Sequence, residues 1–488
     1  MSNLSELLPA GAGGKNVSFV ASGTLPNGKP VILKANGTIE VVSGAGAVTG
    51  SKTVFETATT RYGSSVYDTN TNRVVIAYSD QGNSQYGTSI VGTVSGTTIS
   101  FGTAVVFETA EVQDVAITFD NNSNKIVIAY ADEGNSSHGT AIVGTVSGTS
   151  ISFGSAVVFE AGNTDDIATT FDSNSNKVVI AYSDLGNSDF GTAIVGTVSG
   201  TSISFGTAVV FESANSSDMQ LAFDPNSNKV VIVYRDIGNS LYGTTIIGTV
   251  SGTGISFGTA VVFLAASAGD MNNPVIDSTN NKVIISYKNG GNSNKAEARV
   301  GTISGTSISF GTAVAFSSGS SQFYTGGAYH AGLQKVVFAY RDDTANTLTG
   351  KYNVGTVSGT DISFSGEVIF NSGRADNISL VYDPDSTNLV NSFEDNANSS
   401  YGTSQVFSPS VTNLTATNFI GISDSAISSG AAGKATIKGG IKTGLSSLTP
   451  NAIYYVQTDG TITTASASPA VRIGKALSST SINLEYNS

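Results

Sequence analysis

Most of the chain alternates short runs of β-branched and aromatic residues with turns rich in Ser, Thr, Asn and Gly. The apolar run Lys177–Tyr182 (KVVIAY) is typical of an inner strand that is buried on both faces. Further strands of this unit are expected over Asp166–Asp172, from Gly191 onwards and over Ser202–Phe211. Proline is nearly absent from these segments, and they have no helical periodicity. The pattern predicts an all-β protein.

The same unit recurs seven times, at intervals of 52 or 53 residues. Its marker is an Asp that follows an aromatic or apolar residue and precedes a polar turn and an apolar run. The marker residues are Asp68, Asp120, Asp172, Asp224, Asp277, His330 (in place of Asp) and Asp383. Repeats of this length that are dense in strand formers predict the blades of a β-propeller.

The seventh unit lacks its fourth strand. Its first three strands begin at Leu380, Leu389 and Gly402, and nothing like SISFGTAVVF follows them. At the other end of the chain, residues 47–56 (AVTGSKTVFE) resemble the ISFGTAVVFE of the complete units. We therefore predict that residues 47–56 pair with residues 402–408. This pairing would close a seven-bladed ring and remove an exposed sheet edge.

A second, smaller β-rich domain is expected outside the ring, formed by residues 1–42 and 411–488, with the propeller over 43–410. PVILKANGTIEV follows Pro26, and IYYVQTDGTIT follows shortly after Pro450; each has a strand, an Asn-Gly or Asp-Gly hairpin turn and a second strand. The simplest account is one duplicated domain with the ring inserted in a loop. Two unrelated β tails are the alternative.

Loops of an up-and-down blade alternate between the two faces of the disc. The turns between strands one and two and between strands three and four share one face, which we call the bottom face. The chain enters and leaves the ring on this face, so we expect the small domain beneath it. The top face carries the crossings from strand four to the next blade, which differ between repeats (ETAEVQD, EAGNTDD, LAASAGD). Variation over a constant frame is typical of a recognition surface.

One series of residues persists in these crossings, at the start of strand one. If strand one is innermost, their side chains surround the mouth of the central channel and could bind sugar hydroxyls or a cation. The alternative is that each Asp caps a local turn. These predicted ligand-binding residues are Tyr62, Asp114, Asp166, Asp218, Asp270, Phe323 and Asp376.

A second series lies in the loops between strands two and three. It loosely resembles the Asp-box turn of sialidase-like propellers, which is structural in that family. An Asx turn is a sufficient explanation, and metal binding is the alternative. The series comprises Asp80, Asp132, Asp184, Asp236, Asn289, Asp342 and Asp395. The rings that precede the following Gly-Thr could stack on sugars or pack between blades: Tyr86, His138, Phe190, Tyr242 and Tyr401.

The motifs favour a protein that is not an enzyme. His138 and His330 stand at repeat positions held elsewhere by other residues, and two histidines are too few for an imidazole metal site. A sialidase would need an arginine cluster, but only Arg235 and Arg341 occupy equivalent positions. No nucleophile elbow, phosphate loop or dinucleotide fingerprint can be placed. We predict no catalytic residue, no metal and no cofactor.

Composition excludes several partners. Charged residues make up 12% of the chain and the net charge is −13, which argues against nucleic-acid binding. No apolar stretch approaches the ~20 residues of a membrane helix, so membrane insertion is not expected. The chain has no cysteine, which excludes disulfides. Its first residues lack the pattern of a secretory signal, so we expect synthesis in a cytoplasm.

The repeat wording KVVIAYSDLGNSDFGTAIVGTVSGTSISFGTAVVFESA resembles kelch-type propeller arrays in virion proteins of tailed phages, especially marine ones, although the double glycine of true kelch blades is absent. Residues 1–42 and 417–488 resemble the end pieces of tail-fibre or head-decoration proteins of that family. The resemblance implies a non-enzymatic virion surface protein, an oligomer that docks to other virion proteins through residues 1–42 and 411–488. Its propeller would meet host-surface glycans. A capsid-cementing protein and a glycan-cleaving propeller enzyme are the alternatives.

Overall fold

The computed structural model describes residues 16–34, 36–45, 48–271, 273–344, 348–409, 411–412, 414–415, 417–466 and 470–485. The chain divides into two compact units, residues 1–48 with 409–488 and residues 49–408. Strands form the framework of both units, and the short 3₁₀ turns of the described residues lie in the larger one. Across the described residues, none of the helical segments has the length and hydropathy needed to cross a membrane.

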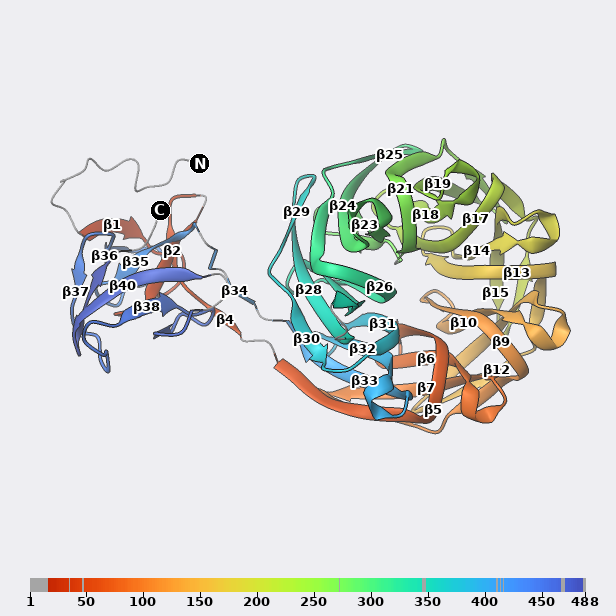
Figure 1. The fold of residues 1–488 in the computed structure, drawn as a ribbon, viewed down its shortest axis with the longest axis horizontal. Coiled ribbons are helices and arrows are strands. Elements are labelled where there is room, and N and C mark those ends of the chain that lie inside the picture. The colour runs from red at the N-terminus through yellow and green to blue at the C-terminus, as the bar shows by residue number, and fades with distance from the viewer. Residues whose placement is uncertain are drawn as a thin grey trace. The chain divides into compact units, whose positions relative to one another are not determined.

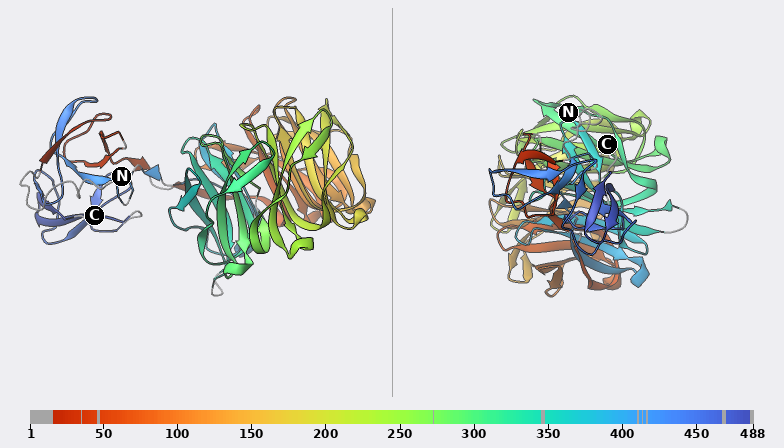
Figure 2. Two further views of the ribbon diagram at one scale, coloured as in Figure 1. Left: turned by 90° about the horizontal axis from the view of Figure 1, so that it is seen from above. Right: turned by 90° about the vertical axis from the view of Figure 1, so that its left-hand side faces the viewer.

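The larger unit is a seven-bladed β-propeller, seen down its axis in Figure 1 and edge-on in the left view of Figure 2. Strand two of the blades is β6 (Arg73–Asp80), β10 (Lys125–Asp132), β14 (Lys177–Asp184), β18 (Lys229–Asp236), β23 (Lys282–Asn289), β27 (Lys335–Asp342) and β32 (Asn388–Asp395). Strand three is β7 (Tyr86–Ser95), β11 (His138–Ser147), β15 (Phe190–Ser199), β19 (Tyr242–Ser251), β24 (Lys295–Ser304), β28 (Thr349–Ser358) and β33 (Tyr401–Ser408). As predicted, strand two is buried on both faces, and Val178–Tyr182 is fully buried.

Most blade junctions are crossed by one long strand, which is the outer strand of one blade and the innermost strand of the next. These strands are β5 (Val48–Asp68), β9 (Val105–Asp120), β13 (Val157–Asp172), β17 (Val209–Asp224) and β26 (Val314–His330). At the two remaining junctions the strand is split, into β21 (Val261–Met271) and β22 (Val275–Asp277), and into β30 (Val368–Asn371) and β31 (Ala375–Asp383). The first part of strand four is a separate short strand, namely β8 (Thr98–Phe101), β12 (Ser150–Phe153), β16 (Ser202–Phe205), β20 (Gly254–Phe257), β25 (Ser307–Phe310) and β29 (Asp361–Phe364).

The crossings between blades, for which the sequence predicted no strand, are themselves extended strands in most junctions. In β13, Asn163 pairs with blade two and Thr164 pairs with blade three, so hydrogen bonds on both sides hold the crossing extended. The continuous strand four predicted over Ser202–Phe211 is wrong, because it is interrupted between β16 and β17. A Cβ on Gly206 would lie 2.0 Å from the carbonyl oxygen of Thr253, so the strand breaks where the turn of the next blade approaches it.

The predicted ring closure is confirmed. In the closed series of strands, β33 is followed by β5, so the N-terminal strand completes the seventh blade. The side-chain amide of Gln405 donates to the carbonyl oxygen of Gly50 at 2.9 Å. Ala47, the first residue of the predicted strand, lies outside the described residues.

Neighbouring blades are joined by a repeated aromatic contact. The ring of Phe159, on the outer strand of blade two, lies 5.3 Å from that of Tyr182 and 5.7 Å from that of Phe205, both in blade three. The same arrangement centres on Phe55, Phe107, Phe211, Phe263 and Phe316. At the seventh junction Phe370 lies 5.2 Å from Phe393. Offset and edge-on rings at this separation stabilise the junctions beyond the area that they bury.

The marker Asp residues are structural. Asp172 Oδ1 accepts hydrogen bonds from the amides of Asn174 (2.9 Å) and Ser175 (3.0 Å), and Oδ2 accepts one from the Ser175 hydroxyl at 2.6 Å. At the sixth position, His330 Nδ1 accepts from the Leu333 amide at 3.3 Å and so replaces the Asp. These turns share the bottom face with the turns between strands three and four, because Arg73 Nε donates to the carbonyl oxygen of Gly148 at 3.0 Å.

The smaller unit contains two five-stranded sheets with the same strand order. One is β1 (Asn16–Val20), β36 (Ala432–Thr436), β35 (Phe419–Ser423), β2 (Pro30–Leu33) and β3 (Ile39–Val41). The other is β37 (Ile441–Lys442), β41 (Ser481–Leu484), β40 (Val471–Ser478), β38 (Ile453–Val456) and β39 (Ile462–Thr463). A further antiparallel pair, β4 (Gly44–Ala45) and β34 (Val411–Thr412), joins the segment that precedes the propeller to the segment that follows it.

The two sheets match in detail, as the predicted duplication requires. Each contains a bulge at the same place, since Val31 faces Gly421 and Tyr454 faces Gly474 immediately before a register shift. The hairpin turns also match, because the side chains of Asn36 and Asp459 each accept the amide two residues later, at 3.1 and 2.8 Å. The propeller therefore interrupts the first copy between its third and fourth strands.

We expect Phe159→Ala to lower the free energy of unfolding of the propeller by about 3–5 kcal/mol, because it removes a buried ring that contacts two others. Chemical denaturation measures the change. The matched control is Val158→Ala, a neighbouring side chain that is 42% exposed, which should change stability by no more than about 0.5 kcal/mol. Equal effects of the two substitutions would contradict the role assigned to the aromatic contacts.

Candidate functional site

The innermost strands of the propeller line a cavity of about 660 Å³, which we call the axial cavity. Its wall includes Tyr62, Asp114, Asp166, Asp218, Asp270 and Asp376, so six of the seven predicted residues come together. The seventh, Phe323, lies in β26, but its side chain is outside the described part of the chain.

The backbone explains why Asp recurs at this position. Five residues of the series sit at a register shift of the innermost strand and have a positive φ: 51° at Tyr62, 48° at Asp114, 52° at Asp166 and Asp218, and 30° at Asp270. Among residues other than Gly, Asp and Asn are those that most often adopt this left-handed conformation. The side chain is thereby turned out of the regular pleat of the strand.

One member of the series was assigned wrongly. In blade seven the residue with positive φ is Asn377 (φ 48°), not Asp376. Asp376 faces Glu394, as Asp165 faces Ser183 in blade three, so it occupies the preceding register position. The sequence comparison matched Asp to Asp, whereas the bulge accepts Asn equally well.

Three carboxylates form what we call the acidic arc: Asp114, Asp165 and Asp166. The backbone amide of Asp166 donates to Asp114 Oδ2 at 3.0 Å, which connects blades two and three across the arc. Burial, and then the neighbouring Asp165 carboxylate, raise the pKa of Asp114 well above its usual value. Burial and the carboxylates of Asp218 and Asp165 raise the pKa of Asp166 to about 7. Within the described residues, no ion pair neutralises this arc.

Two further carboxylates of the cavity wall, Asp218 and Asp270, form the paired arc, where each has a cation from the chain. Arg235 Nε lies 3.2 Å from Asp218 Oδ2, and Lys288 Nζ lies 2.9 Å from Asp270 Oδ2. Both cations stand at the end of strand two, where Arg235 faces Ser217 and Lys288 faces Gly269.

The same strand-two position distinguishes the two arcs. It is occupied by Ala131 in blade two and Ser183 in blade three, which are too short to reach the carboxylates. Around the ring the position reads Ser79, Ala131, Ser183, Arg235, Lys288, Arg341 and Glu394. The equivalence of Arg235 and Arg341 was recognised from the sequence, but the change from uncharged residues in blades one to three to cations in blades four to six was not.

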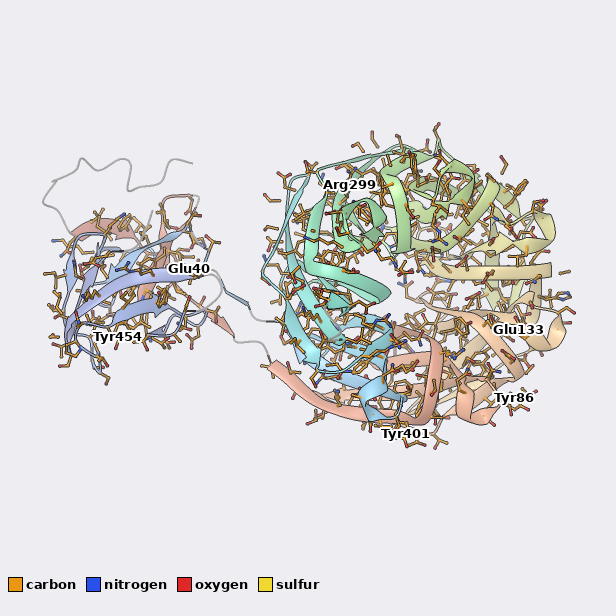
Figure 3. All side chains as sticks on the ribbon, viewed as in Figure 1. Glu40, Tyr86, Glu133, Arg299, Tyr401 and Tyr454 are labelled. Atoms are coloured by element: carbon orange, nitrogen blue, oxygen red, sulfur yellow. The ribbon has the colours of Figure 1, made fainter. Side chains whose placement is uncertain are left out.

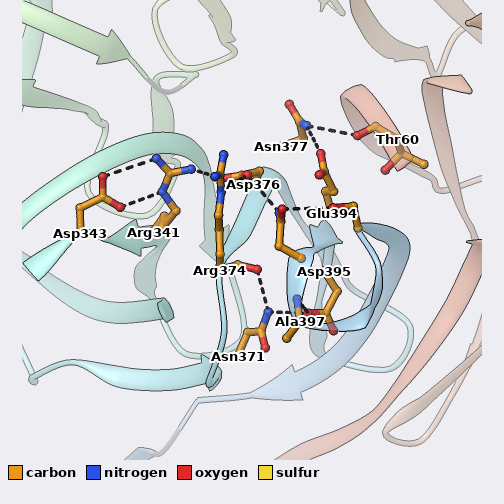
Figure 4. Close-up of polar contacts among 12 residues, drawn as sticks. Thr60, Arg341, Asp343, Asn371, Arg374, Asp376, Asn377, Glu394, Asp395 and Ala397 are labelled. Atoms are coloured by element: carbon orange, nitrogen blue, oxygen red, sulfur yellow. Dashed lines mark hydrogen bonds and ion pairs between the residues drawn. The ribbon is translucent and has the colours of Figure 1, made fainter. Parts of the chain in front are cut away.

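In blade seven one carboxylate meets two arginines, Arg374 and Arg341 from β27 of blade six (Figure 4). Arg374 Nε lies 2.5 Å from Asp376 Oδ2, and Arg341 pairs with the other oxygen of the same carboxylate. The amide of Asn377 donates to Glu394 Oε2 at 3.1 Å and to the carbonyl oxygen of Thr60 at 3.2 Å, which fastens blade seven to the first blade. The side of the cavity opposite the acidic arc is therefore rich in built-in cations and fixed hydrogen bonds.

Five of the seven loops between strands two and three are held by Asx contacts, as predicted, whereas Asp132 and Asp184 make no such side-chain hydrogen bond. Asp80 accepts from the amide of Gly82 at 2.9 Å, and Asp236 from that of Asn239 at 2.9 Å. Equivalent bonds are made by Asn289, Asp342 and Asp395. The aromatic series before Gly-Thr is half-buried and outside the axial cavity, with Tyr86 and Tyr401 at the outer rim of the ring (Figure 3). In the described part of the chain no group of three or more His, Asp or Glu is arranged to hold a metal ion.

No protein-family model matches the chain, and no curated protein matches it. Solved structures that resemble it include a mutant Trypanosoma rangeli sialidase displaying trans-sialidase activity, with 13% identity and a TM-score of 0.40 over 80% of this chain and 58% of that one. The same sialidase in complex with the inhibitor DANA gives 15% identity and 0.41 over 80% and 59%. The periplasmic gluconolactonase of Pseudomonas aeruginosa gives 9% and 0.47 over 74% and 97%. The chain thus spans less than two thirds of either sialidase, and these likenesses concern the fold alone.

The raised pKa of Asp166 makes stability depend on pH. Between the ordinary value of 3.8 and about 7, the folded state binds a proton that the unfolded state has lost, so stability falls as the pH rises through this window. We expect Asp166→Asn to reduce this fall and to raise the melting temperature at pH 8 relative to the unaltered protein. Thermal unfolding at pH 5 and pH 8 measures it. Asp361→Asn, exposed at the start of β29, is the control and should keep the original pH dependence.

Proposed function

We propose that the chain is a non-enzymatic virion surface protein of a tailed phage, and that its propeller binds a host-surface glycan in the axial cavity. The observation that carries the binding part is the asymmetric charge of the cavity wall. A cavity of about 660 Å³ has, among the described residues, carboxylates without an ion pair on one side and ion-paired carboxylates and arginines on the other.

A hydroxyl-rich ligand suits this wall. A carboxylate accepts hydrogen bonds from hydroxyl groups, and an arginine or asparagine donates them, so both sides of the cavity have partners for a sugar. The carboxylates are held in place before binding, because the left-handed backbone at each bulge fixes where the side chain starts. Little ordering entropy is then lost when a ligand enters.

The acidic arc also limits the choice of ligand. Asp114, Asp165 and Asp166 disfavour an anionic group beside them, since like charges in a partly buried site repel. A neutral glycan, or one with an amino group directed at this arc, fits better than one with an acidic sugar there. An acidic group would be accepted only on the side of Arg374 and Arg341.

The resemblance of residues 1–42 and 417–488 to phage end pieces supports the particle part of the proposal. In this proposal the smaller unit docks to other virion proteins, and the protein acts as an oligomer. A glycan-cleaving enzyme is the second candidate, and it rests on Asp166. A carboxyl group with a pKa near 7 beside other carboxylates has the property of a general acid in glycoside hydrolysis.

The binding proposal is tested on a glycan array with the purified chain and two kinds of variant. In the combined variant Asp114→Ala, Asp166→Ala and Asp218→Ala, we expect binding to fall at least tenfold, because three acceptors leave the cavity wall. In Ser183→Arg, the cation of blade four is copied into blade three, where it should pair with Asp166 and block the acidic arc.

The matched control is Asp189→Asn, in a loop between strands two and three and outside the cavity wall, which should leave binding unchanged. Binding that survives both cavity variants would remove the axial cavity from the proposal. Hydrolysis of any array glycan that is abolished by Asp166→Asn would favour the enzyme instead.

A further inference from the structure

Three residues of the smaller unit bring an amine, an amide and a carboxyl group together. Lys442 is on β37, Asn27 lies between β1 and β2, and Asp424 follows β35. Lys442 Nζ is 3.4 Å from Asn27 Oδ1 and 3.4 Å from Asp424 Oδ1. Lys442 and Asn27 are 415 residues apart in sequence.

The lysine is unusual for its burial. Lys442 is 5% exposed, yet both of its oxygen partners are at the long end of the hydrogen-bond range. A buried ammonium normally needs close ionic or hydrogen-bonded partners to offset its desolvation. Two contacts at this length satisfy its three N–H groups poorly.

The two oxygens of the Asp424 carboxyl group have different surroundings. Thr436 Oγ1 donates to its Oδ1 at 2.5 Å, which fixes the orientation of the group. The other oxygen, Oδ2, is buried and has no hydrogen-bond partner. An oxygen in that setting is well suited to carry a proton and to pass it to a neighbouring group.

The duplication supplies an internal control. At the equivalent place on the other side of the duplication, Leu477 stands for Asp424 and Val17 stands for Lys442. Asn27 is replaced there by Pro450, because the amides of Gly28 and Asn451 make the matching hydrogen bonds, to the carbonyl oxygens of Ser423 and Ala476. The fold of the domain therefore does not require the lysine or the aspartate. Asn27 and Asp424 of the first sheet meet Lys442 of the second at one of two equivalent places, which calls for another reason.

We propose that Lys442 and Asn27 form an intramolecular isopeptide bond, with Asp424 as the proton carrier. A proton moves from Lys442 Nζ to Asp424, and the resulting amine attacks Cγ of Asn27. A bond forms between Nζ and Cγ, and the bond between Cγ and Nδ2 breaks. The leaving nitrogen takes a proton by way of Asp424 and departs as ammonia. The reaction needs no oxidant, metal or other reactant.

The bond would close a covalent loop around the whole propeller. It joins a segment that precedes the ring to one that follows it, and it ties the first sheet of the smaller unit to the second. A cross-link that spans so long a loop restricts the unfolded chain strongly. In a chain without cysteine, it supplies the cross-link that a disulfide supplies elsewhere.

The test is the intact mass of the full purified chain under denaturing conditions. We expect a mass lower than that of the sequence by one ammonia, and a branched peptide containing Asn27 and Lys442 after proteolysis. The decrease should be lost completely in Lys442→Arg, and also in Asp424→Asn, which alters the carboxyl group with little change of shape. Asn451→Ala, in the corresponding turn of the second sheet, should retain it.

One competing reaction has the same mass change. Asn27 precedes Gly28, and attack by the Gly28 amide nitrogen would give a succinimide with loss of ammonia. That nitrogen is engaged in a hydrogen bond to the carbonyl oxygen of Ser423 at 3.0 Å. A mass decrease that persists in Lys442→Arg identifies the succinimide and overturns the proposal. An unmodified mass in the unaltered protein also overturns it and leaves an ion pair between Lys442 and Asp424.

Discussion

The structure depends on one constraint, the closure of seven similar blades into a ring. Each blade presents a phenylalanine from its outer strand to the next blade, where a tyrosine and a second phenylalanine receive it in most junctions. Only a ring gives every one of these phenylalanines a partner. The pairing of β5 with β33 completes the circle with strands from opposite ends of the propeller. The axial cavity exists because the innermost strands of a closed ring cannot meet at its centre.

The positions that repeat in every blade and the position that varies lie in different parts of this ring. The bottom turns are closed by one buried Asp with nearly the same hydrogen bonds in each blade, or by His330 in one of them. The end of strand two, by contrast, changes from Ala131 and Ser183 to Arg235 and Lys288 around the axis. A repeated frame with one variable charged position gives the cavity an acidic side and a cationic side. A symmetric ring would have neither.

The number of blades, the closure and the duplicated small domain follow from the sequence, because each rests on spacing and on apolar patterns that recur. The course of the crossings does not follow, because Glu212–Ser217 is polar and extended only through hydrogen bonds to two blades at once. The position of Asp376 was misjudged for a related reason: a bulge is defined by backbone conformation, which Asn377 satisfies as well as Asp does. Ion pairs such as Arg235–Asp218 join residues that are distant in the repeat, and no local sequence pattern predicts them.

The closing blade has a mechanical consequence. Gly50 lies beside Val406, and Phe55 lies beside Gly402, so β5 and β33 run in opposite directions. Both connections to the rest of the chain, before residue 49 and after residue 408, leave from the same end of this strand pair. A pulling force on those connections would act on the pair as on a zipper, breaking its hydrogen bonds one after another from that end. The pair of β5 and β33 would therefore be the first part of the ring to bear the force. A covalent bond between the segments outside the ring would bear that force in place of the strand pair.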